Sequence, residues 1–222
     1  MLEHKKIQNL SDYFVELNSR REKGVYFYRI NGYSEEVGEF IKKYYDTARR
    51  TGVVIEGKIP NPDEGNLAYY NEIMGMDFQM SMDFIHVSLR KWLPRMNEFQ
   101  RQNVAASIYD SLDSLRKAGK TENMLRNAYI KFMCWLYYKF ERIVNQLGDN
   151  YIPKILYEGQ ISSHELILLS ILSNAGCDVV LLQYAGDQGY LKTDPGSVLS
   201  DSLQMEGLQP FPQGYCVKKV RD

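Results

Sequence analysis

Polar and charged side chains follow four short apolar stretches of the chain, each at the point where the stretch ends in a turn. They are Arg29, Asn31, Tyr33 and Ser34 after the first stretch, Glu56 and Lys58 after the second, Glu158, Ser162, Ser163 and His164 after the third, and Tyr184 and Asp187 after the fourth. Backbone amides at a helix start, together with a basic side chain, hold phosphate groups. We therefore predict that these residues bind a phosphorylated or nucleotide-like ligand, with Arg29 or Lys58 on the phosphate.

His164 and Glu158 are the candidates for acid–base catalysis. His164 is one of three histidines and stands in the first turn of a predicted helix, directly after a predicted strand. A general acid or base needs a partner, and Glu158 or Asp187 would supply one across the strand ends. The alternative is an exposed histidine on a helix surface. A similar alternative applies to Ser34 and Ser162, because capping of the following helix alone explains a serine at each position.

The spacing of metal-ligating residues indicates no metal site. Asp83 and His86 are three residues apart and would share a helix face, but no third ligand stands at a matching spacing and their neighbours are apolar. The chain also has none of the standard phosphate-loop, dinucleotide, nucleophile-elbow or zinc-helix motifs. The sequence therefore leaves the cofactor and the reaction unassigned, and it leaves open whether the protein is an enzyme.

Hydrophobic periodicity places the candidate residues on two strand–helix–strand units. Strands are predicted at 25–30 and 53–57 around a helix capped by Ser34, and at 153–159 and 177–182 around a helix capped by Ser162. Ser162 and Glu165 match the capping box S-x-x-E. Residues 5–20 are predicted to form a further packing helix. The segment after Tyr184 is rich in turn residues and is predicted to be irregular.

Between the two units the sequence predicts helices and no strand, with helical patterns at about 78–93, 104–118 and 121–147. The predicted fold class is α/β, with a Rossmann-like parallel sheet built from two βαβ units and a large all-helical insertion between them. Residues 1–62 and 149–222 would form the sheet domain, and residues 63–148 the helical insertion. Because the carboxyl ends of parallel strands share one edge, we expect the four polar turns, near positions 30, 57, 160 and 186, to lie along a common rim.

Composition and charge exclude several classes of protein. The 222 residues are 44% hydrophobic and 25% charged, which is typical of a globular protein. The 27 basic and 28 acidic residues give a net charge of -1, which provides no field for nucleic acid or an anionic membrane. The N-terminus lacks the apolar run of a secretory signal, and the three cysteines are widely spaced. We expect a cytoplasmic protein that binds neither nucleic acid nor a membrane.

Three phrases of the sequence resemble the YceG-like family. They are GVYFYRINGY at 24–33, VIEGKIPNP at 54–62, and HE at 164–165 followed by GCDVVLL at 176–182. The resemblance implies a cytoplasmic bacterial protein that is a component of a biosynthetic module, found in gene neighbourhoods for tellurium and stress resistance. Other stress-response or biosynthetic proteins would be its partners. The resemblance implies no activity and no functional residue.

Two functions remain open at this point. The first is binding of a phosphorylated or nucleotide-like metabolite at the strand ends, in a stress-associated biosynthetic pathway. The alternative is a non-catalytic assembly module that docks a partner through its aromatic helical segment, which the 17 tyrosines and the lack of catalytic motifs favour. This alternative requires an exposed apolar patch on the insertion, and it fails if Trp92, Trp135 and Tyr137 are all enclosed.

Overall fold

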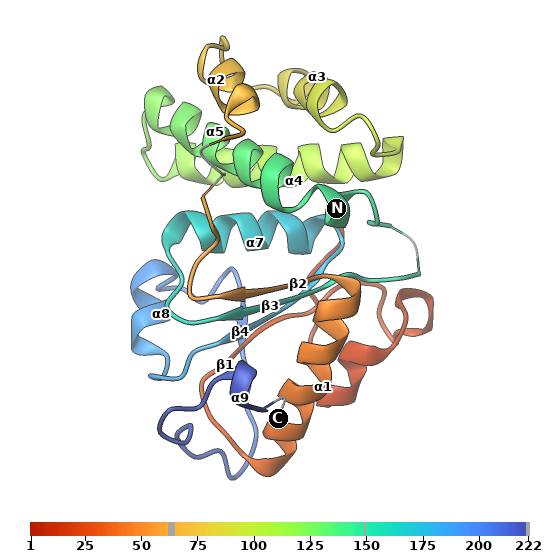
Figure 1. The fold of residues 1–222 in the computed structure, drawn as a ribbon, viewed down its shortest axis with the longest axis vertical. Coiled ribbons are helices and arrows are strands. Elements are labelled where there is room, and N and C mark those ends of the chain that lie inside the picture. Colours follow the sequence, from red (N-terminus) through yellow and green to blue (C-terminus); the bar gives the residue numbers. More distant parts are fainter. Residues whose placement is uncertain (62–64, 149, 221–222) are drawn as a thin grey trace.

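A five-stranded parallel sheet forms the centre of the protein in a computed structural model that describes residues 1–61, 65–148 and 150–220 (Figure 1). The strand order is β2-β3-β4-β1-β5. The strands are β1 (Phe27–Ile30), β2 (Val53–Glu56), β3 (Lys154–Glu158), β4 (Asp178–Leu182) and β5 (Asp201–Ser202). Every pair is parallel, and nine α-helices accompany the sheet within the described ranges. The predicted mixed α/β class is confirmed.

Helix α1 (Glu35–Thr51) covers one face of the sheet. Ser34 caps it by accepting a hydrogen bond of 3.2 Å from the backbone N–H of Val37, and acidic residues in its first turn and basic residues in its last turn suit the helix dipole. Its apolar stripe packs on the β1, β3 and β4 side chains that point to this face. The predicted cap and the predicted helix end at Gly52 are both confirmed.

The other face is covered by α7 (Ser163–Ala175), and five further helices lie beyond α7, the two longest packed directly on it and two shorter ones stacked outside those (Figure 1). These are α2 (Ala68–Met74), α3 (Met82–Trp92), α4 (Glu98–Lys117), α5 (Glu122–Lys139) and α6 (Glu141–Val144). Because α7 lies between the sheet and α4, most of its side chains are buried, including the polar Glu165, Ser170 and Ser173 as well as its leucines and isoleucines. The predicted edges of the helical insertion, at 62/63 and 148/149, fall on or beside residues 62–64 and 149, which lie outside the described residues.

The two predicted strand–helix–strand units differ in their connections. β3 and β4 are neighbours and are joined by α7. β1 and β2 are parallel strands of the same sheet, but β4 and β3 lie between them, so α1 crosses two strands. Local sequence predicts the strands and the helix of the first unit, but which strands become neighbours depends on packing between distant segments.

Two parts of the chain differ from the sequence-based prediction. Residues 5–20 do not form an α-helix but contain two 3₁₀ turns, η1 (Leu10–Phe14) and η2 (Leu17–Ser19), because the segment packs on the same face of the sheet as α1 and carries Arg20 into the interior. The tail is more regular than predicted. It contains α8 (Gln188–Thr193), the edge strand β5 and α9 (Val217–Val220).

Candidate functional site

The carboxyl ends of four strands form one rim of the sheet. Glu56 at the end of β2 is in register with Glu158 of β3, Glu158 with Leu182 of β4, and Leu182 with Ile30 of β1. The four polar turns therefore follow neighbouring strand ends on the same edge of the sheet. The expectation of a common rim is confirmed.

A crevice of about 510 Å³ opens on this rim between β1 and β4, where the chain turns to one face of the sheet after β1 and to the other face after β4. The turn after β1 leads to α1 on one face, whereas the turn after β4 leads to α8, whose Tyr190 belongs to the core on the other face. This divergence leaves a hollow between the two turns. Its polar lining consists of Asn31, Tyr184, Asp187, Ser202, Gln204 and Gln209. Asn31 and Asp187 are among the residues predicted to bind a ligand.

Arg29 fixes Asp187 at the wall of the crevice. Its Nε donates to Asp187 Oδ1 at 2.6 Å, and Nη2 donates to Oδ2 at 3.0 Å, so the pair is bidentate. Nη1 donates to the backbone oxygen of Ser200 at 2.8 Å, and the guanidinium lies 4.3 Å from the ring centre of Tyr190. Arg29 is 2% exposed. It therefore orients a carboxylate and is not available as the phosphate ligand that the sequence predicts.

A buried hydrogen-bond chain supports this wall from below. Ser200 Oγ donates to the hydroxyl of Tyr190 at 2.6 Å, and that hydroxyl donates to Asp194 Oδ2 at 2.7 Å. The Asp194 carboxylate also accepts the backbone N–H groups of Val198 and Leu199. A satisfied buried network of this kind resists rearrangement, so the loop between α8 and β5 holds the crevice wall in place.

The tail closes the rim between β3 and β1. Tyr33 and Gln209 form an antiparallel bridge, and the ring of Tyr33 packs on Phe211 and Tyr215. The hydroxyl of Tyr184 donates to Glu158 Oε2 at 2.5 Å, and that oxygen also accepts the backbone N–H at the start of α9. Burial, and then the neighbouring carboxylate, raise the pKa of Tyr184 far above its ordinary value, so its hydroxyl keeps its proton. The predicted residues Tyr33 and Glu158 thus hold the tail.

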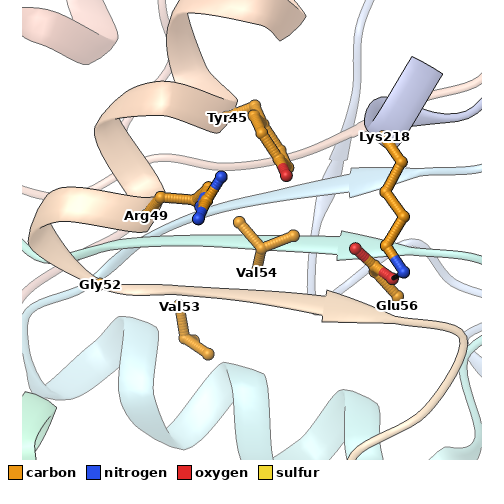
Figure 2. Close-up of a pocket in the computed structure, with 7 residues that line it drawn as sticks. All are labelled: Tyr45, Arg49, Gly52, Val53, Val54, Glu56 and Lys218. Atoms are coloured by element: carbon orange, nitrogen blue, oxygen red, sulfur yellow. Dashed lines mark ion pairs between the residues drawn. The ribbon is translucent and has the colours of Figure 1, made fainter. Parts of the chain in front are cut away.

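Glu56 faces a different hollow, between the free edge of β2 and α1 (Figure 2). This groove of about 670 Å³ is lined by Tyr45 and Arg49 of α1 and by Lys218 of α9, whose Nζ lies 2.7 Å from Glu56 Oε2. Lys58, in the turn that follows β2, is exposed. Glu56 and Lys58 therefore belong to the outer edge of the sheet and do not line the crevice at β1 and β4.

The start of α7 is fixed by the predicted capping box. Ser162 Oγ accepts the Glu165 backbone N–H at 3.4 Å, while Glu165 Oε1 accepts the Ser162 backbone N–H at 3.3 Å. Glu165 Oε2 also accepts the N–H of Ile59 at 2.7 Å and the hydroxyl of Tyr157 at 2.9 Å. Glu165 is 7% exposed and joins the loop after β2 to β3 and α7. Ser162 is a cap, as the structural alternative proposes, and Ser163 is exposed.

His164 points away from the crevice and toward the helical layer. Its ring packs edge-on against Phe132 of α5, with ring centres 6.0 Å apart. Partial burial, and then the positive charges of Lys131 and Lys120, lower its pKa. Glu158 meanwhile is bonded to Tyr184 and the start of α9. The structure does not bring His164 and Glu158 together as an acid–base pair.

The remaining candidates have structural surroundings. His86 Nε2 lies 3.1 Å from Glu98 Oε1, and Asp83 is exposed in the first turn of α3. Within the described ranges no three histidine, cysteine, aspartate or glutamate residues are grouped closely enough to hold a metal ion. Sequence reasoning missed Ser202, Gln204 and Gln209 of the crevice, because β5 has two residues and the tail carries only turn signals.

A comparison with curated proteins and with solved structures finds no match to this chain. Across residues 1–61, 65–148 and 150–220, no helix is both long and apolar enough to cross a bilayer. The YceG domain family matches residues 5–221, which is nearly the whole chain. The protein therefore belongs to the YceG domain family.

Proposed function

We propose that this protein binds a small hydroxylated metabolite, such as the sugar portion of a nucleotide-like molecule, in the crevice between β1 and β4. The observation that carries the proposal is the chemistry of the lining. Asn31, Ser202, Gln204 and Gln209 line the same hollow as one carboxylate, that of Asp187, which Arg29 holds in a fixed orientation. Neutral donors and acceptors beside a fixed carboxylate suit the hydroxyl groups of a sugar.

The position of the crevice supports the same proposal. We interpret the sheet as a doubly wound, Rossmann-like arrangement with a helical insertion between β2 and β3. In such sheets ligands bind outside the carboxyl ends of the strands, at the point where neighbouring connections diverge to opposite faces. The crevice occupies that point, between the turns after β1 and β4.

The sugar, rather than the phosphate, is the group that the crevice would recognise. Among the described residues that line it there is no lysine, arginine or histidine. We therefore keep the proposal of a phosphorylated or nucleotide-like ligand, but we propose that the protein recognises its sugar and not its phosphate. Sugar hydroxyls would bind Asp187 and the neighbouring amides, and a phosphate would extend into solvent. No reaction is assigned to the site.

Thermal unfolding against a matched set of compounds tests this proposal. The set is ribose, ribose 5-phosphate, adenosine, AMP and inorganic phosphate. A compound at a hundred times its dissociation constant adds about 2.7 kcal/mol to the free energy of unfolding. We expect the compounds that contain ribose to raise the midpoint and inorganic phosphate to leave it unchanged. A shift with inorganic phosphate alone would contradict recognition of the sugar.

Variants locate the binding. Asn31→Ala and Gln204→Ala each remove one hydrogen-bonding group from the lining and should weaken binding roughly 2- to 10-fold. Gln213→Ala removes an exposed amide of the tail that does not line the crevice, and it serves as the matched control. If both crevice variants bind as tightly as the control, the ligand occupies another place.

The pathway is also part of the proposal. The resemblance to the YceG-like family suggests that the bound metabolite belongs to a biosynthetic module linked to tellurium and stress resistance. A strain in which the gene is deleted should then lose resistance to tellurite, and a strain that carries Asn31→Ala and Gln204→Ala in place of the natural gene should show a partial loss. Unchanged resistance in the deletion strain would remove this connection.

The second candidate function is assembly through the aromatic helical segment. Trp135 is buried, Trp92 and Tyr137 are half-buried, and both of these rings pack on Tyr69. Most of the aromatic side chains of the predicted docking surface therefore pack against other helices of the same chain. What remains in favour of the candidate is a set of exposed apolar side chains on these helices, among them Val87 of α3 (59% exposed), Phe99 of α4 (50%) and Met124 of α5 (50%). If this surface docks a partner, Val87→Glu should abolish co-purification of that partner with the tagged protein from its host.

A further inference from the structure

A third hollow lies among the helices beyond α7, between α2 and α5. It has a volume of about 290 Å³ and shares no lining residue with the crevice at the strand ends. Its walls are mainly apolar and aromatic. They include Tyr70, Met74, Ile130, Lys131, Cys134 and Trp135.

The spacing of the lining residues explains why the hollow has a continuous wall. Asn127, Ile130, Lys131 and Cys134 follow an i, i+3, i+4, i+7 pattern, which places them on one face of α5. Tyr70 and Met74 are four residues apart on α2 and face them. The hollow is thus a cleft between two helix faces.

Two hydrogen bonds join α2 to α5 beside the cleft. At one end the backbone N–H of Tyr70 donates to the hydroxyl of Tyr138 at 3.3 Å, and at the other the guanidinium of Arg126 donates to the backbone oxygen of Met74 at 2.5 Å. Trp135 and Ile130 are each 5% exposed, so their positions are set by packing. A wall fixed in this way binds a rigid ligand without a large ordering cost.

The side chains of the cleft favour a flat ring with a negative charge. The phenol of Tyr70, which is 38% exposed, offers an aromatic surface against which another ring packs favourably, and the largely buried indole of Trp135 forms part of the wall on α5. The Lys131 ammonium lies 5.3 Å from the ring centre of Trp135, so it would stand beside an anionic group attached to a ring on that wall. None of the described lining residues is acidic. The amides of Asn61 and Asn127 complete the polar edge.

We propose that the cleft between α2 and α5 is a second binding site, whose ligand is a planar aromatic anion of one or two fused rings. Its volume of about 290 Å³ is just below the usual range for drug-sized ligands, which suits a ligand of one or two rings. The site is independent of the crevice at β1 and β4, and it adds a second ligand to the protein.

Calorimetric titration with 2-naphthoate tests the proposal. 2-Naphthylmethanol is the uncharged comparison, and the saturated decalin-2-carboxylate is the non-planar one. We expect saturable binding of 2-naphthoate, weaker binding of the alcohol and no detectable binding of the saturated acid. Absence of saturable binding of 2-naphthoate, or equal affinity for the saturated acid, would overturn the proposal.

Substitutions in the lining identify the site. Asn127→Phe fills the cleft from an exposed position and should abolish binding, whereas Asn123→Phe, at an exposed position one turn earlier that is outside the lining, should leave it intact. Lys131→Met should weaken 2-naphthoate roughly fivefold and leave the alcohol unaffected. Tyr70→Ala removes the aromatic ring of one wall at an exposed position, and it should also abolish or strongly weaken the binding of 2-naphthoate.

The outcomes separate this proposal from that of the strand-end crevice. Asn31→Ala should not change the affinity for 2-naphthoate, because Asn31 lines only the crevice. If Asn127→Phe and Tyr70→Ala both bind 2-naphthoate as tightly as the unmodified protein, or if Lys131→Met has no selective effect, the cleft is not the binding site.

Discussion

A buried ionic cluster at the amino ends of the strands allows a strong test of how the fold is held together. The carboxylate of Asp178 accepts hydrogen bonds from Arg20 Nη1 at 2.9 Å, Arg20 Nη2 at 2.5 Å, Lys154 Nζ at 2.5 Å and the backbone N–H of Tyr26 at 3.0 Å. The side chains of Asp178 and Arg20 are 0% exposed, and that of Lys154 is 7% exposed. One carboxylate therefore balances two cations inside the protein.

Asp178→Asn keeps the shape of this side chain and removes its charge. Breaking a buried ion pair by removing one partner costs about 3–5 kcal/mol, because the other partner remains as an uncompensated buried charge. Here two cations lose their counter-charge, so we expect a loss of stability in the upper part of that range. For a chain of this length the loss corresponds to a fall of roughly 10 °C or more in the unfolding midpoint.

The dependence of this loss on pH identifies its cause. Burial lowers the pKa of Lys154, and the charge of Asp178 opposes that effect. Without Asp178, Lys154 should release its proton at a lower pH in the folded state than in the unfolded state. The unfolded state then binds more protons, so the free energy of unfolding rises with pH. The deficit of Asp178→Asn should therefore shrink as the pH approaches 10.5, the ordinary value for lysine.

Urea unfolding of matched variants provides the measurement. Asp201→Asn is the control, because Asp201 pairs with a largely exposed Lys6 and such surface pairs contribute about 1 kcal/mol at most. Adding Lys154→Met to Asp178→Asn should recover part of the lost stability, since one buried cation is then absent. A loss below about 1 kcal/mol for Asp178→Asn, or a loss equal to that of the control, would refute the reasoning.

Three further predictions concern other parts of the chain. Glu165→Ala should lower the free energy of unfolding by about 2–3 kcal/mol, because it leaves the buried donors around the start of α7 without an acceptor, and urea unfolding checks this. Gly52→Ala should prevent folding, because an added Cβ would lie 1.8 Å from the Lys154 backbone oxygen. Gly57→Ala is the comparison: its φ is +82° and an added Cβ would have no neighbour within 4 Å, so it should lower the free energy of unfolding by only about 1 kcal/mol. Circular dichroism and thermal unfolding distinguish the two variants. Burial lowers the pKa of His4 below 6.5, so in acid the unfolded state binds more protons than the folded state. The free energy of unfolding should therefore fall as the pH drops below 6.5, and His4→Gln should make it depend less on pH in this range.

Local features of the structure could be predicted from the sequence. Each strand of the two predicted units is present, and Ser34 and Ser162 cap the helices that follow them. These features depend on neighbouring residues, because a cap needs only a hydroxyl and a nearby backbone N–H. The N-terminal prediction failed although residues 5–20 have helical spacing. The reason is that the buried pair of Arg20 with Asp178 and the contacts of the segment with the sheet favour a different path.

The candidate site could be predicted only in its location. The rule for parallel sheets places the polar turns on one edge, and the strand pairing agrees. The roles of individual residues differ, however. Arg29 is occupied by Asp187, a partner 158 residues away in the chain, and Ser202 and Gln204 join the crevice through a two-residue strand. No local pattern indicates such contacts.

The sequence by itself determined the class of the fold, the approximate positions of most of its strands and longer helices, and the side chains that follow each strand. Those properties arise from periodicity, turn residues and caps within a few positions of one another. The tertiary structure decided the strand order, the position of the tail over the rim and the direction in which His164 points. These depend on which distant apolar faces and buried charges can be satisfied together, and that is settled only when the whole chain packs.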